Sequence, residues 1–232
     1  MTSQLNEFRQ PVGIPLEFTG PWPSPHMPVL QGRSVRLEAA HADHAQGLFS
    51  SFSHDTSGKN WTYMPTSPTG SFDEFNAWYL ATCFGDDPRF YVVVDQATDI
   101  AIGVASYLRI NPRDGSIEVG WISMSPLMQR SIKSTEAMFL MMQHVFDDLG
   151  YRRYEWKCDA LNAPSRAAAQ RLGFTFEGIF RQCTHYKGRN RDTAWLAIID
   201  GDWPAQKARF QAYLDPDNFD DNGQQIKPLQ AH

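Results

Sequence analysis

Glu118 is a carboxylate set among apolar residues, a setting that lets a carboxylate take up a proton near neutral pH. Ile117, Val119 and Trp121 surround it in a run that predicts a β-strand. Partial burial there would disfavour the charged form and raise the pKa of the carboxyl towards the range in which a general base works well. We therefore identify Glu118 as a candidate base. The alternative is an outward-facing strand glutamate paired with a neighbouring arginine.

The segment after this strand has the plan of an anion-binding site. The strand ends at Ser125-Pro126, and the polar connection Gln129–Ser134 leads into a helix predicted over Thr135–Leu149, with Gly150 as its stop. The first-turn amides of a helix have no intrahelical partner, and the helix dipole favours negative charge beside them. The loop is therefore expected to hold an anionic group.

The rest of the chain predicts the elements that position these residues. Strands are predicted over residues 33–38, 89–95, 100–110, 117–122, 154–159, 174–181 and 192–199, and helices over 41–52, 71–83, 135–149, 164–172 and 203–214. Short turns join the second, third and fourth strands into an antiparallel meander, whereas the strand–helix–strand crossover over 117–159 predicts parallel pairing. The predicted fold class is α+β, built on one mixed sheet.

Two sets of residues resemble a known family. The motif Gln/Arg-x-x-Gly-x-Gly/Ala would fall on Gln129, Ile132 and Ser134, and Glu118 stands eleven residues before Gln129, where members with a glutamate base place it. The downstream residues in the family's order are Asn162-Ala-Pro-Ser165, Arg171-Leu-Gly-Phe174, Glu177-Gly178, Arg181, Lys187-Gly188 and Asp192. Over about residues 30–200 the chain resembles the GCN5-related N-acetyltransferases, and within them the branch that acetylates ribosomal-protein N-termini.

This resemblance implies a GNAT-type acyl-CoA N-acyltransferase fold, in which a mixed, mostly antiparallel sheet is flanked by helices, with acetyl-CoA as cosubstrate. The loop amides would hold its pyrophosphate, and the sheet would be splayed beside Ile122, leaving an amide for the thioester carbonyl. Gly120 and Ser123 permit a bulge there. The residues implied to bind acetyl-CoA are Ile122, Met124, Gln129, Arg130, Ser131, Ile132, Lys133, Ser134, Thr135 and Asn162.

The loop departs from the family pattern at Ile132, where glycine is usual. A β-branched residue is strongly disfavoured at positive φ, whereas glycine is not. Either the loop keeps negative φ throughout, or its affinity for the cofactor is reduced.

The resemblance also suggests which residue protonates the leaving thiolate. The tyrosine that many members use would fall on Ala169, so Ser165 is the candidate acid, as in the ribosomal-protein branch. Asn162 and Ser165 are equally ordinary helix N-cap residues, and that alternative stays open. A second glutamate base of that branch would fall on Thr184; the adjacent His185 could replace it or lie on the surface of a hairpin.

Aromatic residues between the first two helices are candidates to line the acceptor pocket. In the resembled family this connection covers the acceptor site, and here it carries Trp61, Tyr63 and Met64. The alternative is that these side chains cap the hydrophobic core.

Length and composition fit one globular domain with extensions. The expected organisation is a Pro-rich arm over residues 1–30, an acetyltransferase domain over 31–200, and a helix with a mobile tail over 201–232. Phe18, Trp22 and Leu30 are expected to pack the arm onto the domain or a second subunit; a disordered leader is the alternative. The net charge of −5 argues against DNA as a partner and suits an amine substrate.

The remaining features predict a cytoplasmic protein with no metal. Cys83, Cys158 and Cys183 show no CxxC spacing and are expected to be buried free thiols. The N-terminus lacks a signal-peptide pattern, and no apolar run is long enough to cross a membrane. His41 and His44 share a predicted helix, but without a third ligand they predict no metal site. The chain could be a monomer or a homodimer.

Together these features predict an N-acetyltransferase that moves an acetyl group from acetyl-CoA to a primary amine by direct attack. The acceptor would be a protein N-terminus or a small-molecule amine. The alternative is a degenerate relative that binds CoA weakly or not at all and acts as an interaction module. Ile132, Ala169 and Thr184 favour that alternative, whereas Glu118, Asn162 and Ser165 oppose it.

Overall fold

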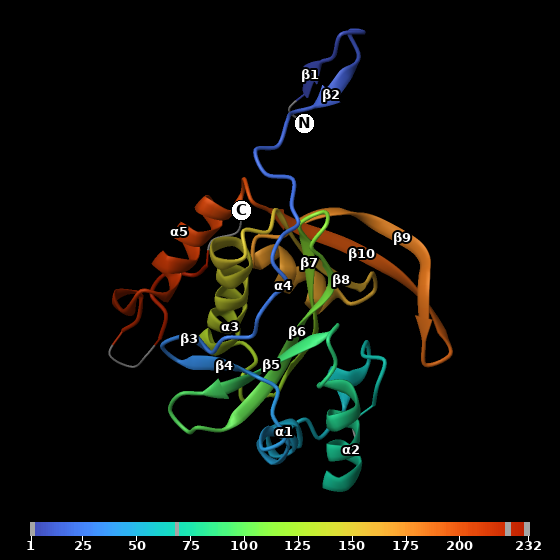
Figure 1. Ribbon diagram of the computed structural model, residues 1–232. Helices are drawn as coiled ribbons and strands as arrows, with labels where there is room; N and C mark the ends of the chain where they lie inside the picture. Colours follow the sequence, from blue (N-terminus) through green and yellow to red (C-terminus); the bar gives the residue numbers. More distant parts are fainter. Residues whose placement is uncertain (1–2, 68–69, 221–223, 230–232) are drawn as a thin grey trace.

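The protein is built on one eight-stranded mixed sheet, seen in a computed structural model that describes residues 3–67, 70–220 and 224–229 (Figure 1). Neighbouring strands are antiparallel except β7 and β8, which are parallel, so the predicted mixed, mostly antiparallel sheet is confirmed. In spatial order the strands are β3 (Leu30–Gln31), β4 (Val35–Ala39), β5 (Arg89–Asp95), β6 (Ala101–Asn111), β7 (Ser116–Met124), β8 (Arg153–Asp159), β10 (Arg189–Ile199) and β9 (Thr175–Tyr186).

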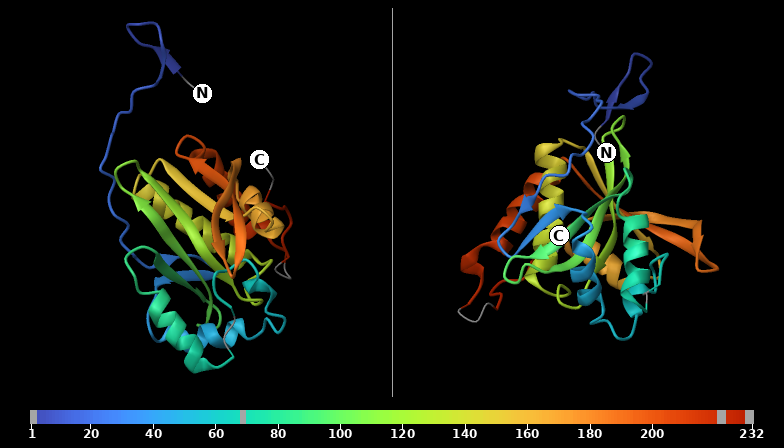
Figure 2. Two further views of the ribbon diagram at one scale, coloured as in Figure 1. Left: turned by 90° about the vertical axis from the view of Figure 1, so that its right-hand side faces the viewer. Right: turned by 60° about the horizontal axis from the view of Figure 1, so that its bottom comes forward.

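Helices cover both faces of the sheet (Figures 1 and 2). On β5, Tyr91 and Val93 enter one hydrophobic core while Val92 and Val94 enter another, because successive side chains of a strand point to opposite faces. The first core is closed by α3 (Ile132–Gln143), α4 (Ala163–Arg171) and α5 (Trp203–Leu214). The second is closed by α1 (His44–Phe52) and α2 (Phe72–Thr82).

The central helix begins earlier than predicted. Ser131 is extended, with φ −119° and ψ 167°, and α3 starts at Ile132 rather than Thr135. Ile132, Lys133 and Ser134, which were assigned to the connection, therefore lie in the first helical turn. The helix passes into a single π-helical turn, η2 (His144–Asp148), and Gly150 follows with φ +64°, as its predicted role as a stop requires.

The N-terminal arm is only partly as predicted. Trp22 is buried, and its indole Nε1 donates to the carbonyl of Gly150 at 2.7 Å, while Leu30 is buried in β3. Phe18 is 55% exposed and packs edge-on against Trp22, with a ring separation of 5.0 Å, so it is only partly buried on the domain. The segment before it forms a separate hairpin of β1 (Ser3–Leu5) and β2 (Pro11–Gly13), which stands clear of the sheet in Figures 1 and 2.

Three further expectations are corrected. The first helix begins at His44, so His41 precedes it, and the His41 amide donates to Nδ1 of His44 at 3.1 Å. Cys83 and Cys158 are buried, but Cys183 is exposed because both faces of β9 are largely open to solvent. The segment after α5 was expected to be a mobile tail, but it contains the short helix η3 (Pro216–Asn218) and the buried residue Leu229. Residues 221–223 and 230–232 of the predicted mobile tail lie outside the described residues.

Candidate active site

The parallel strands β7 and β8 separate halfway along their length. Their pairing runs from Ser116 with Arg153 to Val119 with Trp156 and goes no further. On the other side of β7, Trp121 and Ile122 together face the single residue Ala105 of β6, a bulge in which Trp121 takes φ +50°. The bulge and the end of the pairing leave backbone of β7 beyond Val119 without a partner on β8, as the resemblance implied.

A cleft of about 290 Å³ opens where the two strands separate. It brings together predicted residues that are distant in the sequence, namely Tyr63, Met64, Glu118, Ile122, Asn162 and Ser165. It also contains charged side chains that the sequence analysis did not single out, namely Arg109, Lys157, Asp159 and Arg191.

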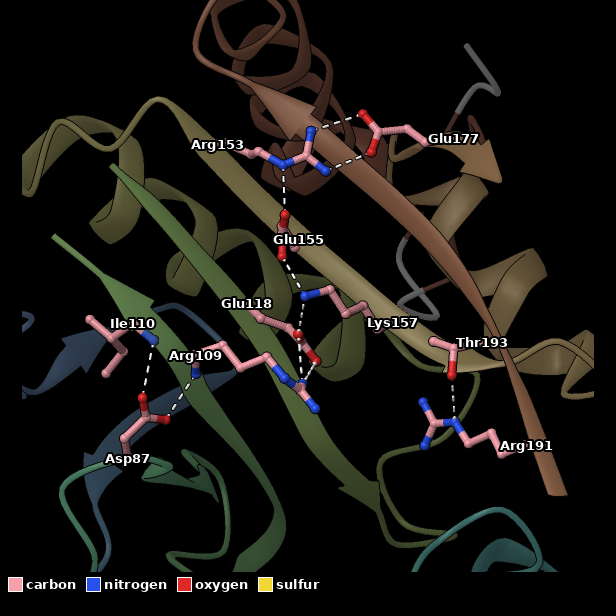
Figure 3. A network of polar contacts seen from close by, with 10 residues as sticks. All are labelled: Asp87, Arg109, Ile110, Glu118, Arg153, Glu155, Lys157, Glu177, Arg191 and Thr193. Carbon is pink, nitrogen blue, oxygen red and sulfur yellow. Dashed lines mark hydrogen bonds and ion pairs between the residues drawn. The ribbon is translucent and has the colours of Figure 1, made fainter. Parts of the chain in front are cut away.

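Glu118 lies in the cleft and is held between two cations (Figure 3). Its side chain is 3% exposed, so it does not face outward, but the arginine pairing of that alternative is present. Both carboxylate oxygens accept from Nη1 of Arg109, at 2.7 and 2.8 Å, and Oε2 lies 3.0 Å from Nζ of Lys157. Burial raises the pKa of Glu118 above its ordinary value, against the opposing effect of Lys157 and Arg109.

The two cations reach Glu118 by different routes. Arg109 sits at a second irregularity, where it takes φ +47° and the Asp87 carboxylate accepts from the amides of Arg109 and Ile110. Lys157 extends from β8, bridges Glu118 to Glu155 at 2.7 Å and lies over the ring of Trp195. Lys157 was foreseeable, since parallel pairing of Glu118 with Glu155 puts residue 157 on the same face. Arg109 was not, because its position depends on an irregularity.

Removal of the exposed cation should raise the pKa of Glu118 further. In Arg109→Gln the carboxylate loses one of the two charges that stabilise its ionised form, while burial is retained. A ¹³C-NMR titration of the glutamate carboxyls, assigned with Glu118→Gln, would measure the shift. Arg113→Gln, in the adjacent turn, serves as the matched control and should leave this pKa unchanged. An unchanged or lower pKa in Arg109→Gln would contradict the assigned electrostatics.

The loop before α3 places its one strained residue away from Ile132. Arg130 adopts φ +55° and is exposed, whereas Ile132 is already helical. The first alternative from the sequence, negative φ throughout the loop, is therefore wrong at Arg130, although Ile132 itself is helical. The Gln129 side chain donates to the Met124 carbonyl at 2.8 Å, and Nζ of Lys133 pairs with Asp95 at 2.6 Å. Of the two basic residues, Arg130 is the one that faces solvent.

Asn162 and Ser165 play different structural parts at the start of α4. Oδ1 of Asn162 accepts from the amide of Ser165 at 3.1 Å, so Asn162 is the N-cap. Oγ of Ser165 accepts from the indole Nε1 of Trp156 at 3.0 Å. Ser165 is therefore not the cap, and its hydroxyl lines the cleft. Thr135, deeper in α3, is buried and accepts from Arg171 at 2.7 Å.

The aromatic connection divides between core and cleft. Trp61 is buried against Phe52 in the second core, so its predicted place in the pocket is wrong and the core alternative holds. Tyr63 and Met64 line the cleft, and the Tyr63 hydroxyl donates to the carbonyl of Leu161 at 3.1 Å. The side chain of Trp61 was misassigned because the short helix η1 (Lys59–Trp61) turns it inward.

Two searches bear on other kinds of site. Among residues 3–67, 70–220 and 224–229, no cluster of three His, Cys, Asp or Glu side chains has the geometry to hold a metal ion. Within the same residues, every helix is too short or too polar to span a lipid bilayer. Thr184 and His185, the positions considered for a second base, both line the cleft.

With this geometry in place, comparison with known proteins identifies relatives. Residues 34–175 match the family described as the acetyltransferase (GNAT) domain. A GCN5-related N-acetyltransferase from Brucella melitensis is 46% identical, with a TM-score of 0.89 and coverage of 92% of this chain and 96% of that one. A probable GNAT-family acetyltransferase from Chromobacterium violaceum is 36% identical, with a TM-score of 0.75 and coverage of 83% and 96%.

A curated relative matches over a shorter stretch. The N-acetyltransferase p20 of Bacillus licheniformis is 28% identical over 115 residues, which are 50% of this chain. The match spans 64% of the length of that relative. It covers too little of either protein to carry a substrate from one to the other.

Proposed function

The chain belongs to the GNAT acetyltransferase family, and we propose that it transfers the acetyl group of acetyl-CoA to a primary amine by direct attack of the amine on the thioester. The observation that best supports this proposal is the cleft at the separated ends of β7 and β8, where Glu118 and Ser165 meet. The acceptor is a small-molecule amine or a protein N-terminus.

The residues around the cleft fit acetyl-CoA. The amides in the first turn of α3 would take the pyrophosphate, with the exposed Arg130 side chain adding positive charge. The unpartnered backbone at Ile122 would offer a donor to the thioester carbonyl. Because Oδ1 of Asn162 caps α4, its amide nitrogen would be the donor towards the pantetheine arm. When bound, acetyl-CoA supplies the acetyl group already activated as a thioester.

The two catalytic side chains would handle the protons. The amine nitrogen forms a bond to the acetyl carbon, and the carbon–sulfur bond breaks. Glu118 takes the proton that the amine must lose, directly or through water, because its raised pKa makes it a stronger base than an exposed glutamate. Ser165 gives a proton to the departing thiolate.

Cofactor binding tests the proposal first. Calorimetric titration should show one acetyl-CoA bound per chain, and excess ligand should raise the melting temperature. At 100 times the dissociation constant, binding adds about 2.7 kcal/mol to the free energy of unfolding. S-acetylpantetheine, which lacks the pyrophosphate, is the control and should bind more weakly than acetyl-CoA. Acetyl-CoA should likewise bind more weakly to the Arg130→Gln variant than to the unchanged protein. Absence of both heat and thermal shift would refute the proposal and favour the interaction module.

A further inference from the structure

We propose that the acceptor is an amine that also carries a carboxylate, and that Arg191 binds that carboxylate. This inference deepens the proposed function and rests on it. It is drawn from the distribution of charge around the cleft, in which each carboxylate is already satisfied and one cation is not.

Charged side chains line a single face of the sheet from β7 to β10. Glu155, Lys157 and Asp159 share one face of β8 because alternate residues of a strand point the same way. The register sets Glu118 beside Glu155 at one end of this row and Thr193 beside Asp159 at the other. Arg191, two residues before Thr193 on β10, extends the row, so the cleft has Glu118 on the β7 side and Arg191 on the β10 side.

Both carboxylates of the cleft, Glu118 and Asp159, already have partners within the protein and do not need a cationic group of the substrate. Glu118 is paired with Arg109 and Lys157. Asp159 is buried and accepts from two neutral donors, the Tyr186 hydroxyl at 2.8 Å and the amide of Leu161 at 2.8 Å. An amine with several positive charges would therefore meet cations on the β7 side of the cleft and, beside them, a buried carboxylate whose oxygens already accept hydrogen bonds.

Arg191 is a cation of the cleft whose terminal guanidinium nitrogens are available to bind a ligand. Its Nε donates to Oγ1 of Thr193 at 3.2 Å, and within the described parts of the chain neither terminal nitrogen has a hydrogen-bond partner and no carboxylate pairs with it. Figure 3 shows its guanidinium on the side that faces Glu118 and Arg109. The two terminal nitrogens of a guanidinium fit the two oxygens of a carboxylate.

The position of Arg191 also suits the geometry of the reaction. Its charge is close enough to Cys158, near the separated end of β8, to lower the pKa of that thiol, although burial raises it more. Because Arg191 and Glu118 line the same cleft, an acceptor whose carboxylate binds Arg191 would have its amine in the cleft that contains Glu118. The cleft, at about 290 Å³, suits an acceptor the size of an amino acid or the first residues of a peptide.

Acceptors that differ only in the carboxylate test this inference. L-Glutamate and L-aspartate would be compared with their diamides, and tetrapeptides that begin with Asp would be compared with tetrapeptides that begin with Asn. Spermidine would be tested beside all of them. The rate of each reaction would be measured as thiol release from acetyl-CoA. The kcat/KM of the acids should be about 10- to 100-fold higher than that of the amides. This is the ratio expected from the binding free energy of one hydrogen-bonded charge pair. Preference among the free acids identifies a small-molecule acceptor, whereas preference confined to the tetrapeptides identifies a protein N-terminus.

A pair of arginine variants assigns the effect to one side chain. Arg191→Gln should raise KM for the acids more than for the amides and so abolish the preference for the acids. Arg189→Gln, two residues away and exposed, is the control and should keep the preference. Preference for spermidine, or a preference that survives Arg191→Gln, would overturn the inference while leaving acetyl transfer intact. Failure to acetylate any of the acceptors would overturn both.

Discussion

Glu118→Gln is expected to lower kcat by about 10²- to 10⁴-fold, the range typical of general base catalysis. Glutamine has the same size and can still accept hydrogen bonds from Arg109 and Lys157, but it cannot take up a proton. Acetyl-CoA affinity should not change, because Glu118 is not among the residues proposed to bind the cofactor. Steady-state rates and calorimetric titration of the purified variant measure the two quantities separately.

The pH profile distinguishes a base from a structural carboxylate. Only ionised Glu118 accepts a proton, so kcat/KM should rise with pH as the carboxyl ionises and fall when it is protonated. Because burial raises the pKa of Glu118, this acid limb should lie at higher pH than an ordinary glutamate would give. In Glu118→Gln the limb should disappear, leaving a low rate that no longer depends on this ionisation.

Glu155→Gln is the matched control for this experiment. Glu155 is the register partner of Glu118 and contacts the same Lys157, but it lies outside the cleft. Burial alone would raise the pKa of Glu155, but hydrogen bonds from Lys157 and Arg153 hold it below its usual value. The control should keep most of the activity and the acid limb. Equal losses in both variants would show that the network of charges, rather than proton transfer at Glu118, supports the rate.

The fold was predictable because the signals that determine it are local. The β-branched and aromatic run of β5 predicted Arg89–Asp95, the bounds that the structure has, and Trp203–Leu214 was predicted with equal accuracy from its periodicity. A helix was predicted from residue 71, and Ser71 is indeed the N-cap of α2, where its Oγ accepts from the amide of Glu74. Parallel pairing of β7 with β8 followed from the helix between them.

The charges of the cleft were less predictable because they depend on contacts across the sheet. Arg109 contacts Glu118 only because Asp87 stabilises an irregularity in β6, and no residue near Arg109 in the sequence predicts that irregularity. Arg191 was not singled out in the sequence, because its partial burial in the cleft depends on β8 lying beside β10. Side-chain partners of this kind require register, which periodicity does not supply.

Ser165→Ala is expected to lower kcat by about 10²-fold, the lower end of the range for proton transfer by a positioned side chain. Oγ of Ser165 accepts from Trp156, which leaves the hydroxyl proton available to another group. A sulfur atom already lies near it, since Ser165 lowers the pKa of the Cys158 thiol, although burial has the larger, opposite effect. The hydroxyl is thus placed to stabilise a thiolate.

Conservative variants separate an acid from a packing residue at this position. Ser165→Thr keeps the hydroxyl and should restore most of the rate, whereas Trp156→Phe removes the donor that orients Oγ and should cause a smaller loss than Ser165→Ala. A change confined to KM for acetyl-CoA would assign Ser165 to binding. Full activity in Ser165→Ala would mean that the thiolate departs without an acid, which its chemistry permits because thiols are acidic, with a pKa of about 8.5. Proton transfer by Glu118 would then be the principal catalytic contribution of this cleft.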